Sequence, residues 1–237
     1  MYAVASQRRP PMVRRTKEEA EQTRRQILDA ARRVFHERGV GSTSLEQIAQ
    51  AAGVTRGAIY WHFANKEELF KAMRQEVALP MVDGMDYALL ADPDRTPVQR
   101  LRNFLLQLTH TVQHDESVRR TMEILNFKCE FVGELEKDLA DYIERNEEFL
   151  GKLERTYQAA RRAGQLRPGL SPRVAAMETL TFLTGLLRLR LLGVPSLQRE
   201  QDVRALVDAH VDGRCALQED GADGARRPAG PRGLTPS

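Results

Sequence analysis

A short stretch of the chain gathers side chains that can bind a polyanion. Arg56 and Lys66 carry positive charges, and Thr55, Tyr60 and His62 add hydroxyl, phenol and imidazole groups. A guanidinium can bond guanine O6 and N7 in a major groove, whereas hydroxyl, imidazole and ammonium groups suit phosphate oxygens. These residue types at this spacing predict contacts with duplex DNA rather than bond-making chemistry.

Four neighbouring residues extend the predicted contact set. Gly57 lets a helix approach the DNA backbone closely, and the methyl group of Ala58 can meet a thymine methyl. Thr43 and Ser44 precede a predicted helix, whose N-terminal N–H groups attract anions. The full predicted set of DNA-binding residues is Thr43, Ser44, Thr55, Arg56, Gly57, Ala58, Tyr60, His62 and Lys66. Each member alone also fits an ordinary solvated surface, and it is the combination that favours DNA.

The elements that must present this set form a helix-turn-helix. We expect helices over residues 45–52 and 55–62, joined by a tight turn. Ala49 is small where the two helices nearly touch, Gly53 tolerates a positive φ in the turn, and Ile59 packs back on the preceding helix. The small core of the motif is completed by Ile48, Val54 and Phe63.

The remaining helices are predicted from apolar periodicity and from caps. An apolar stripe ending at Gly39 predicts a helix over residues 17–38, and Trp61 is expected to pack against it. Asn65, with Glu68 as its capping-box partner, begins a fourth helix. A loop over 91–97 follows. Later helices are predicted over residues 97–113, 117–131, 134–163, 172–192 and 199–212, so the fold is expected to be all-α.

Composition excludes several classes of protein. The 237 residues carry a net charge of +3, and 41% of them are hydrophobic, which allows a substantial core. Residues 1–40 hold ten Lys/Arg against five Asp/Glu, a bias that suits a polyanionic partner. We find no apolar run of membrane-spanning length and no signal-peptide pattern, so we expect a cytoplasmic protein. Met1 and Met12 are both candidate start residues.

Cysteine and histidine offer two alternatives to DNA binding. Cys129 and Cys215 lie far apart and lack metal-ligand spacing, so we expect no disulfide framework, metal or cofactor. A thiol enzyme would need His110 or His114 as the base for Cys129, and no nucleophile-elbow pattern supports it. A redox sensor acting through Cys129 or Cys215 stays open.

The C-terminal half shows apolar helical faces interrupted by single polar groups. Such faces form either a closed core or the wall of an apolar cavity with a few orienting groups. The pattern alone favours the core. The stripes are Phe104, Leu105, Leu108 and Val112, then Met122, Leu125, Asn126 and Cys129, then Leu180, Leu183, Thr184 and Leu187.

Three segments resemble a known family. TSLEQIAQAAGVTRGAIYWHFANKEELF (43–70) resembles the DNA-binding domain of the TetR family of transcriptional repressors, and VRRTKEEAEQTRRQILDAA (13–31) extends the similarity. MEILNFKCEFVGEL (122–135) is similar to the AcrR/TtgR group of multidrug-efflux repressors within that family. The segments around 81–96 and 136–160 diverge, so the resemblance does not identify a ligand.

The resemblance implies a homodimeric repressor that binds a palindromic DNA operator of an efflux operon and of its own gene. It also implies a small lipophilic effector and no enzymatic activity, in a cytoplasmic, nucleoid-associated protein. The stripes then become effector-binding candidates, with Asn126 as an orienting hydrogen-bonding group: Phe104, Leu105, Leu108, Met122, Asn126, Cys129, Leu180, Thr184 and Leu187. Control of another metabolic or stress operon, and an architectural or division role on DNA, are alternatives.

The chain is accordingly expected to have five parts. They are a flexible basic arm over 1–15, a DNA-binding domain over 16–64, a linking helix over 65–84, an effector-binding and dimerisation domain over 85–212, and a disordered tail over 213–237. The long helices over 134–163 and 172–192 are predicted to form the dimer, and GLLRLRLLGVP (185–195) is apolar enough to bury a face against a second subunit. An effector that prefers a form with misplaced DNA-binding domains would draw the dimer off its operator, with the linking helix as the lever.

Overall fold

The computed structural model describes residues 17–129 and 136–216, and within these ranges the protein is helical, without a named strand. This confirms the all-α prediction. No helix in the described ranges is long and apolar enough to cross a lipid bilayer. The helices are α1 (Lys17–Arg38), α2 (Leu45–Ala52), α3 (Arg56–His62), α4 (Lys66–Asp86), η1 (Tyr87–Ala91), α5 (Pro97–His114), α6 (Glu116–Glu123), η2 (Ile124–Lys128), α7 (Glu136–Arg162), α8 (Pro172–Leu191), η4 (Pro195–Leu197) and α9 (Glu200–Asp212).

Helices α2, α3 and α4 begin within one residue of the predicted positions because their caps form. Ser44 and Gln47 make a reciprocal capping box at α2. Asn65 accepts the N–H of Glu68 at the start of α4. The Glu68 carboxylate bonds the N–H of Ala64 rather than that of Asn65, so this cap spans one residue more than expected.

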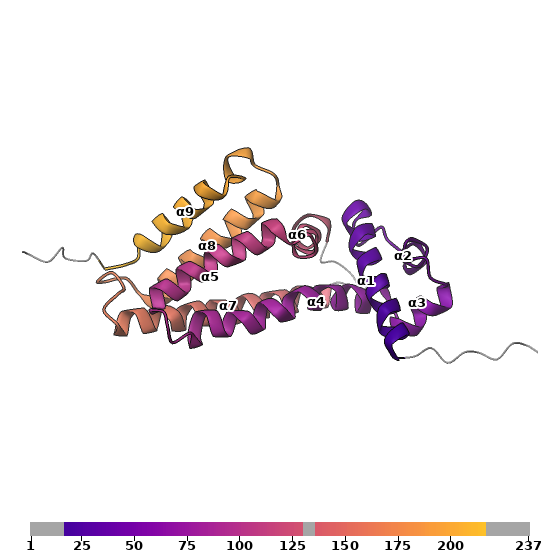
Figure 1. Cartoon of the computed structure of the whole chain (residues 1–237), viewed down its shortest axis with the longest axis horizontal. Helices are drawn as coiled ribbons and strands as arrows, with labels where there is room; N and C mark the ends of the chain where they lie inside the picture. The colour runs from indigo at the N-terminus through magenta and orange to yellow at the C-terminus, as the bar shows by residue number, and fades with distance from the viewer. Residues whose placement is uncertain (1–16, 130–135, 217–237) are drawn as a thin grey trace, which may run out of the picture.

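Buried side chains form two clusters, one at each end of the molecule. The head, which we define as α1–α3, packs with the start of α4 around the first cluster. The C-terminal domain, which we define as residues 97–216, packs with the end of α4 around the second. Figure 1 shows α4 running from the head alongside α7 into the C-terminal domain. Representative members are Phe35, Ile48, Ile59 and Phe70 in the first cluster, and Leu105, Leu153, Leu183 and Val207 in the second.

The helix predicted over residues 117–131 is shorter and irregular. The regular helix α6 ends at Glu123 and continues as one widened turn, η2, before the chain becomes extended at Cys129. Within that turn the side-chain amide of Asn126 donates to the carbonyl of Met122 at 2.8 Å, and so competes with the backbone for this acceptor. Asn126 is therefore engaged with its own helix.

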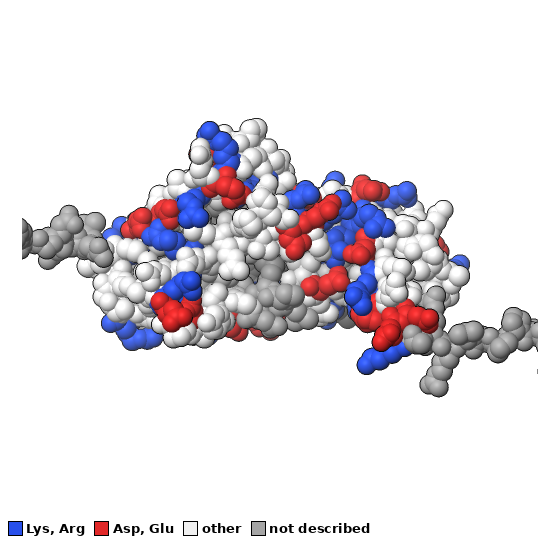
Figure 2. Space-filling model, in the orientation of Figure 1, with Lys and Arg blue, Asp and Glu red and all other residues white. Residues whose placement is uncertain are grey.

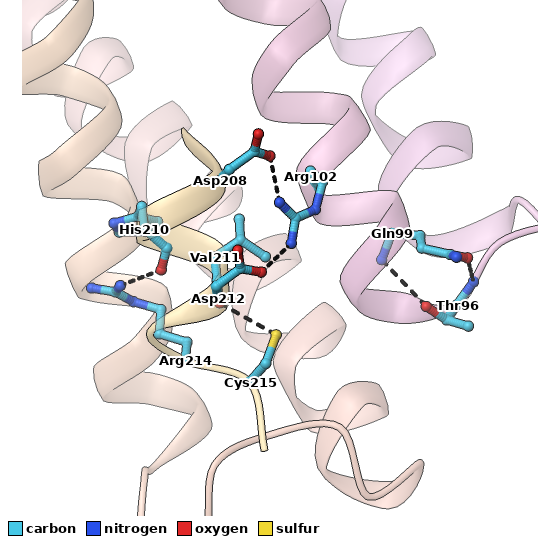
Figure 3. A network of polar contacts seen from close by, with 9 residues as sticks. All are labelled: Thr96, Gln99, Arg102, Asp208, His210, Val211, Asp212, Arg214 and Cys215. Carbon is cyan, nitrogen blue, oxygen red and sulfur yellow. Dashed lines mark hydrogen bonds and ion pairs between the residues drawn. The ribbon is translucent and has the colours of Figure 1, made fainter. Parts of the chain in front are cut away.

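The C-terminal domain closes through polar contacts between α5 and α9. Figure 3 shows Arg102 of α5 paired with Asp208 and Asp212 on successive turns of α9. The described chain also continues past α9, where the N–H of Ala216 donates to the carbonyl of Gln165 at 2.8 Å. Residues 213–216 of the predicted tail are thus ordered against the α7–α8 connection, whereas 217–237 and the arm over 1–15 lie outside the described residues.

Candidate DNA-reading face and ligand cavity

Ala49, Gly53 and Ile59 lie where a helix-turn-helix requires them. Gly53 has a φ of 67°, a left-handed conformation that ends α2, and its N–H bonds the carbonyls of Ala49 and Gln50. Ala49 and Ile59 are buried, so α2 and α3 close on each other. No atom lies within 4 Å of the position that a Cβ on Gly53 would take, so the glycine is required by its φ and not by crowding.

The exposed face of α3 carries a cluster formed by Glu46, Arg56 and Tyr60. The Arg56 side chain is 74% exposed, and its Nη2 lies 3.1 Å from Oε1 of Glu46. The Tyr60 hydroxyl donates to the same carboxylate oxygen at 3.0 Å, and the Arg56 guanidinium lies 5.7 Å from the centre of the Tyr60 ring. A single carboxylate on α2 therefore positions two residues that were predicted to contact DNA.

Glu46 is a site residue that the sequence reasoning missed. The pKa of its carboxyl group is lowered by a hydrogen bond from a backbone N–H, and further by the Tyr60 hydroxyl. The group therefore stays ionised on a surface that would meet phosphates. The one signal in the sequence was an acidic residue in the first turn of the helix over 45–52, and its contact with Tyr60 depends on how α2 and α3 cross.

The loop before α2 separates two predicted contacts. Ser44 is exposed and its hydroxyl caps α2. Thr43 is buried, and its hydroxyl donates to the carbonyl of Gly39 at 2.7 Å, so this side chain stabilises the loop rather than facing outward. Lys66 donates from Nζ to the carbonyl of Gly41 at 3.2 Å, which places its ammonium group beside the same loop.

The expectation that Trp61 packs against α1 is wrong. The Trp61 side chain is 71% exposed, and its ring makes an edge contact with His62 at 4.5 Å between centroids. Ile59 and Phe63 are four residues apart and occupy the buried face of α3. A residue midway between them points to the opposite side, because each residue advances about 100° around a helix of 3.6 residues per turn. Of the other predicted contacts on α3, Gly57 is exposed, whereas Ala58 and His62 are half-buried.

A cavity of about 320 Å³ opens between α4, α5 and the start of α6. Its size is within the range of small-molecule pockets. Phe104 and Leu108, two of the predicted effector contacts, line it. The apolar part of the wall also includes Val77, Met85, Ala88 and Val118, and the polar part consists of Glu76, Gln107, Thr111, Asp115 and Ser117.

The other predicted effector contacts do not line this cavity. Leu105, Leu180, Leu187 and Met122 belong to the core of the C-terminal domain or pack against it. Cys129 packs against the core of the head, and Thr184 is exposed on α8. Phe104, Gln107, Leu108 and Thr111 line the cavity at i, i+3, i+4 and i+7 of α5. The sequence analysis selected only apolar residues of α5 as effector contacts. Two of the four α5 residues that line the cavity, Gln107 and Thr111, are polar.

Polar contacts join the head to α4 and to α6. Arg32 of α1 is buried, and its Nη2 donates to Oε2 of Glu76 on α4 at 2.6 Å. Its Nε donates to the Thr121 hydroxyl on α6 at 3.2 Å. His36 of α1 lies 2.6 Å from a carboxylate oxygen of Glu123. Figure 2 shows charged side chains of both signs crowded where α1 meets α6.

Segment η2 contributes to the same joint from the C-terminal side. Ile124 is fully buried in the core of the head, and Leu125 packs against that core. The N–H of Val40, just after α1, donates to the carbonyl of Lys128 at 3.0 Å. The head is thus attached both to α4 and to the α6–η2 segment, so a change in either can be transmitted to α3.

Comparison with known proteins gives matches for both parts of the chain. Residues 27–73 match the family described as "Bacterial regulatory proteins, tetR family", and residues 96–213 match "MAATS-type transcriptional repressor, C-terminal region". The HTH-type transcriptional regulator TtgR of Pseudomonas putida is 38% identical over 205 residues, which cover 85% of this chain and 95% of TtgR.

Two solved structures agree with the overall arrangement. NalD, the secondary repressor of the MexAB-OprM multidrug efflux pump in Pseudomonas aeruginosa, matches with a TM-score of 0.74 at 35% identity over 85% of this chain and 100% of NalD. SmeT, in complex with triclosan, matches with a TM-score of 0.72 at 32% identity over 91% of this chain and 100% of SmeT. SmeT is the repressor of the Stenotrophomonas maltophilia multidrug efflux pump SmeDEF.

The two matches follow the order of the two structural parts. The tetR family match covers most of the head and the start of α4, and the MAATS-type match covers the C-terminal helices. They also agree with the motifs that surround Gly53 and with the segment that begins at Met122. The chain therefore belongs to the TetR family of bacterial transcriptional regulators, with an N-terminal helix-turn-helix and a C-terminal region of the MAATS repressor type.

Proposed function

We propose that the protein is a homodimeric repressor of a multidrug-efflux operon and of its own gene, released from a palindromic operator by a lipophilic small molecule. The observation that carries the proposal is which side chains of α3 are buried and which are exposed. Ile59 is buried, whereas Arg56, Tyr60 and Trp61 of the same helix are exposed on the outside of the head. The roles of NalD and SmeT as repressors of multidrug efflux pumps support the choice of operon.

In this proposal α3 enters the major groove. Arg56 exchanges its Glu46 partner for a guanine edge, and the methyl group of Ala58 faces a thymine methyl. Tyr60, His62 and Lys66 contact phosphates and set the register of the head on the duplex. Ser44 and the α2 N-terminus add a further phosphate contact, and the buried Thr43 supports the loop that presents them.

We place the dimer interface on α8 and α9. Apolar side chains remain exposed along α8 at Val174, Met177 and Leu189, just after α8 at Leu192, and on α9 at Leu206. An exposed apolar stripe of this kind favours burial against a second subunit. A two-fold axis there would present two heads to two half-sites of a palindrome.

The proposed effector site is the cavity, and its walls lead directly to the head. Glu76 and Val77 belong to α4, which continues from α3, and Val118 belongs to α6, which contacts α1. A ligand that prefers a different spacing of these helices would change the positions of the two heads. Coupling of about 1–3 kcal/mol would alter operator affinity by about 5–150-fold.

The test is fluorescence anisotropy on the intergenic DNA upstream of the protein's own gene and of neighbouring genes. Tight, salt-dependent binding to one palindrome, released by a lipophilic small molecule such as triclosan, which SmeT binds, is the expected result. Binding to many unrelated sites would favour an architectural role. If the palindrome lies beside metabolic or stress genes, the protein regulates one of those operons and not an efflux operon. Loss of binding after peroxide treatment, restored by thiols, would instead favour a redox sensor acting through Cys129 or Cys215.

A further inference from the structure

The boundary between the two buried cores lies within the α6–η2 segment. Met122 packs against the core of the C-terminal domain, whereas Ile124 is fully buried in the core of the head and Leu125 packs against it. The backbone agrees, because the carbonyl of Lys128 accepts the N–H of Val40 at 3.0 Å. Segment η2 therefore packs as part of the head, although it follows α6 in the chain.

Arg188 reaches across this boundary from α8. Its Nη1 donates to the carbonyl of Asn126 at 3.4 Å, and its guanidinium carbon lies over the Phe127 ring, 4.9 Å from the centre. Both contacted residues belong to η2. The ring and the carbonyl constrain the planar guanidinium in two different directions. The Arg188 side chain thus connects a helix of the C-terminal domain directly to a segment that packs with the head.

The base of this arginine lies beside the surface on which we place the dimer. Leu189, the next residue of α8, is 44% exposed and belongs to the apolar stripe of that surface. Leu186 and Leu187, just before the arginine, are buried in the core of the C-terminal domain. Arg188 therefore begins between a packed core and the proposed subunit interface, and its guanidinium ends on the head.

We propose that Arg188 is a positioning residue, which fixes each head relative to α8 and so determines the half-site spacing that the dimer accepts. This inference rests on the homodimer and the palindromic operator proposed above. The contacts of α1 attach the head to α4 and α6, and Arg188 adds an attachment to the helix that carries the proposed interface. One base pair moves a half-site by about 3.4 Å and turns it by about 35°, so a small rotation of the heads decides which spacing fits.

Anisotropy on operators of altered half-site spacing tests this role. The spacer of the palindrome is lengthened or shortened by one base pair, and a single half-site measures the head alone. Arg188→Ala should reduce the affinity penalty for a changed spacer by about fivefold or more. It should leave half-site affinity unchanged, because the side chains of α3 are not altered. An unchanged spacing penalty in a dimeric Arg188→Ala protein would overturn the proposal.

Two further variants separate the contact from charge and from assembly. Arg173→Ala is the matched control, because Arg173 also lies on α8 and bonds Glu154 of the neighbouring α7 at 3.4 Å. It removes the same charge and should keep the full spacing penalty, and an equal loss in this control would refute the role of Arg188. Phe127→Leu removes the ring from η2 and should lower the penalty even if Arg188→Ala disturbs the dimer. The two changes together should have less than the sum of their separate effects, and full additivity would contradict a shared contact.

Hydrogen exchange tests the contact without DNA. Arg188→Ala should speed the exchange of the amides of residues 124–128 and of Val40, whose N–H bonds the carbonyl of Lys128, whereas Arg173→Ala should not. If the protein binds no palindrome, the repressor proposal fails, and exchange still decides whether Arg188 holds η2. Unchanged exchange in Arg188→Ala would refute the positioning role whatever the result on DNA.

Discussion

At the scale of single residues, the notable feature of the reading face is an acidic group among the predicted DNA contacts. Glu46 holds Arg56 and Tyr60 in the DNA-free protein through one carboxylate oxygen. Duplex DNA must offer Arg56 a better partner than this carboxylate. A guanine edge with two acceptors can do so, whereas a single phosphate competes less well. In the proposed complex, Glu46 would therefore favour sequence-specific binding over general attraction to DNA.

Arg56→Ala tests direct base recognition. We expect operator affinity to fall by about 1–3 kcal/mol and one base position to lose its preference, because a bidentate contact with guanine is removed. Anisotropy on the operator, on a series of single-base variants and on random DNA measures both effects. Equal losses on operator and random DNA would show that Arg56 contacts phosphate only.

Glu46→Gln tests the role of the carboxylate. Removal of its negative charge should tighten binding to random DNA and reduce the ratio between operator and random affinities, since Arg56 becomes free to contact phosphates. The same anisotropy series at several salt concentrations checks this. Thermal unfolding should change little, because the cluster is solvent-exposed. A larger operator preference in the variant would contradict this role.

At the scale of elements, the helix-turn-helix depends on one backbone conformation. Gly53→Ala places a side chain at a φ of 67° and should destabilise the head by about 1–2 kcal/mol. Gly57→Ala is the matched control, because Gly57 lies inside α3 and a Cβ there meets only the Thr55 hydroxyl, at 4.0 Å. The control should leave thermal stability unchanged or raise it slightly. An equally stable Gly53→Ala protein would refute the conformational argument.

At the scale of the whole molecule, the two buried cores are connected without merging. Arg32 and His36 pair across the joint, and Ile124 of the C-terminal half is buried in the core of the head. Such a joint allows the head to move as a unit while each core stays packed. In the proposed dimer, binding to a palindrome also requires a fixed distance between the two heads.

Leu189→Glu tests the assembly. The exposed leucine lies on the apolar stripe of α8, and a carboxylate there should prevent dimerisation and reduce affinity for a full palindrome more than for a half-site. Light scattering on size-separated protein gives the mass. Ile143→Glu is the control, since Ile143 is also an exposed apolar residue but lies on α7, and it should remain dimeric. If the Leu189→Glu protein remains dimeric, the dimer interface does not include this part of α8.

The pH dependence of folding tests how α9 is attached to α7 and α8. His210 is buried, and its Nε2 lies 2.9 Å from the Thr179 hydroxyl, which also bonds Tyr157. Burial, with the nearby Arg214 charge, lowers the pKa of His210 from 6.5 to about 4. Below pH 6.5 the unfolded chain binds a proton that the folded chain refuses, so stability falls as the pH drops toward 4.

Denaturant unfolding between pH 7.5 and 4.5 measures this effect. His210→Gln keeps a hydrogen-bonding group next to Thr179 and should show a shallower decline of stability with falling pH than the unchanged protein. His110→Gln, a change at an exposed histidine on α5, should leave the decline as it was. If the stability of all three proteins depends on pH in the same way, His210 does not cause the loss of stability at low pH.

Local sequence was sufficient for the helices and for the motif. Capping residues such as Ser44 and Asn65, the positive φ of Gly53 and the apolar period each act over four residues or fewer, so their consequences can be predicted along the chain. The family resemblance rested on the same short-range signals and is confirmed by the matches to the head and the C-terminal region. The irregular turn η2 escaped prediction, because the apolar period of a short segment does not distinguish a widened turn from a regular one.

Contacts between elements were decided only by the tertiary structure. The outward position of Trp61, the shared carboxylate of Glu46 and the pairing of Arg32 with Glu76 depend on how helices cross and which rotamers fit. Sequence periodicity gives the buried face of a helix but not its neighbour. For the same reason the apolar stripe of α5 did not reveal that Gln107 and Thr111 line the cavity together with Phe104 and Leu108.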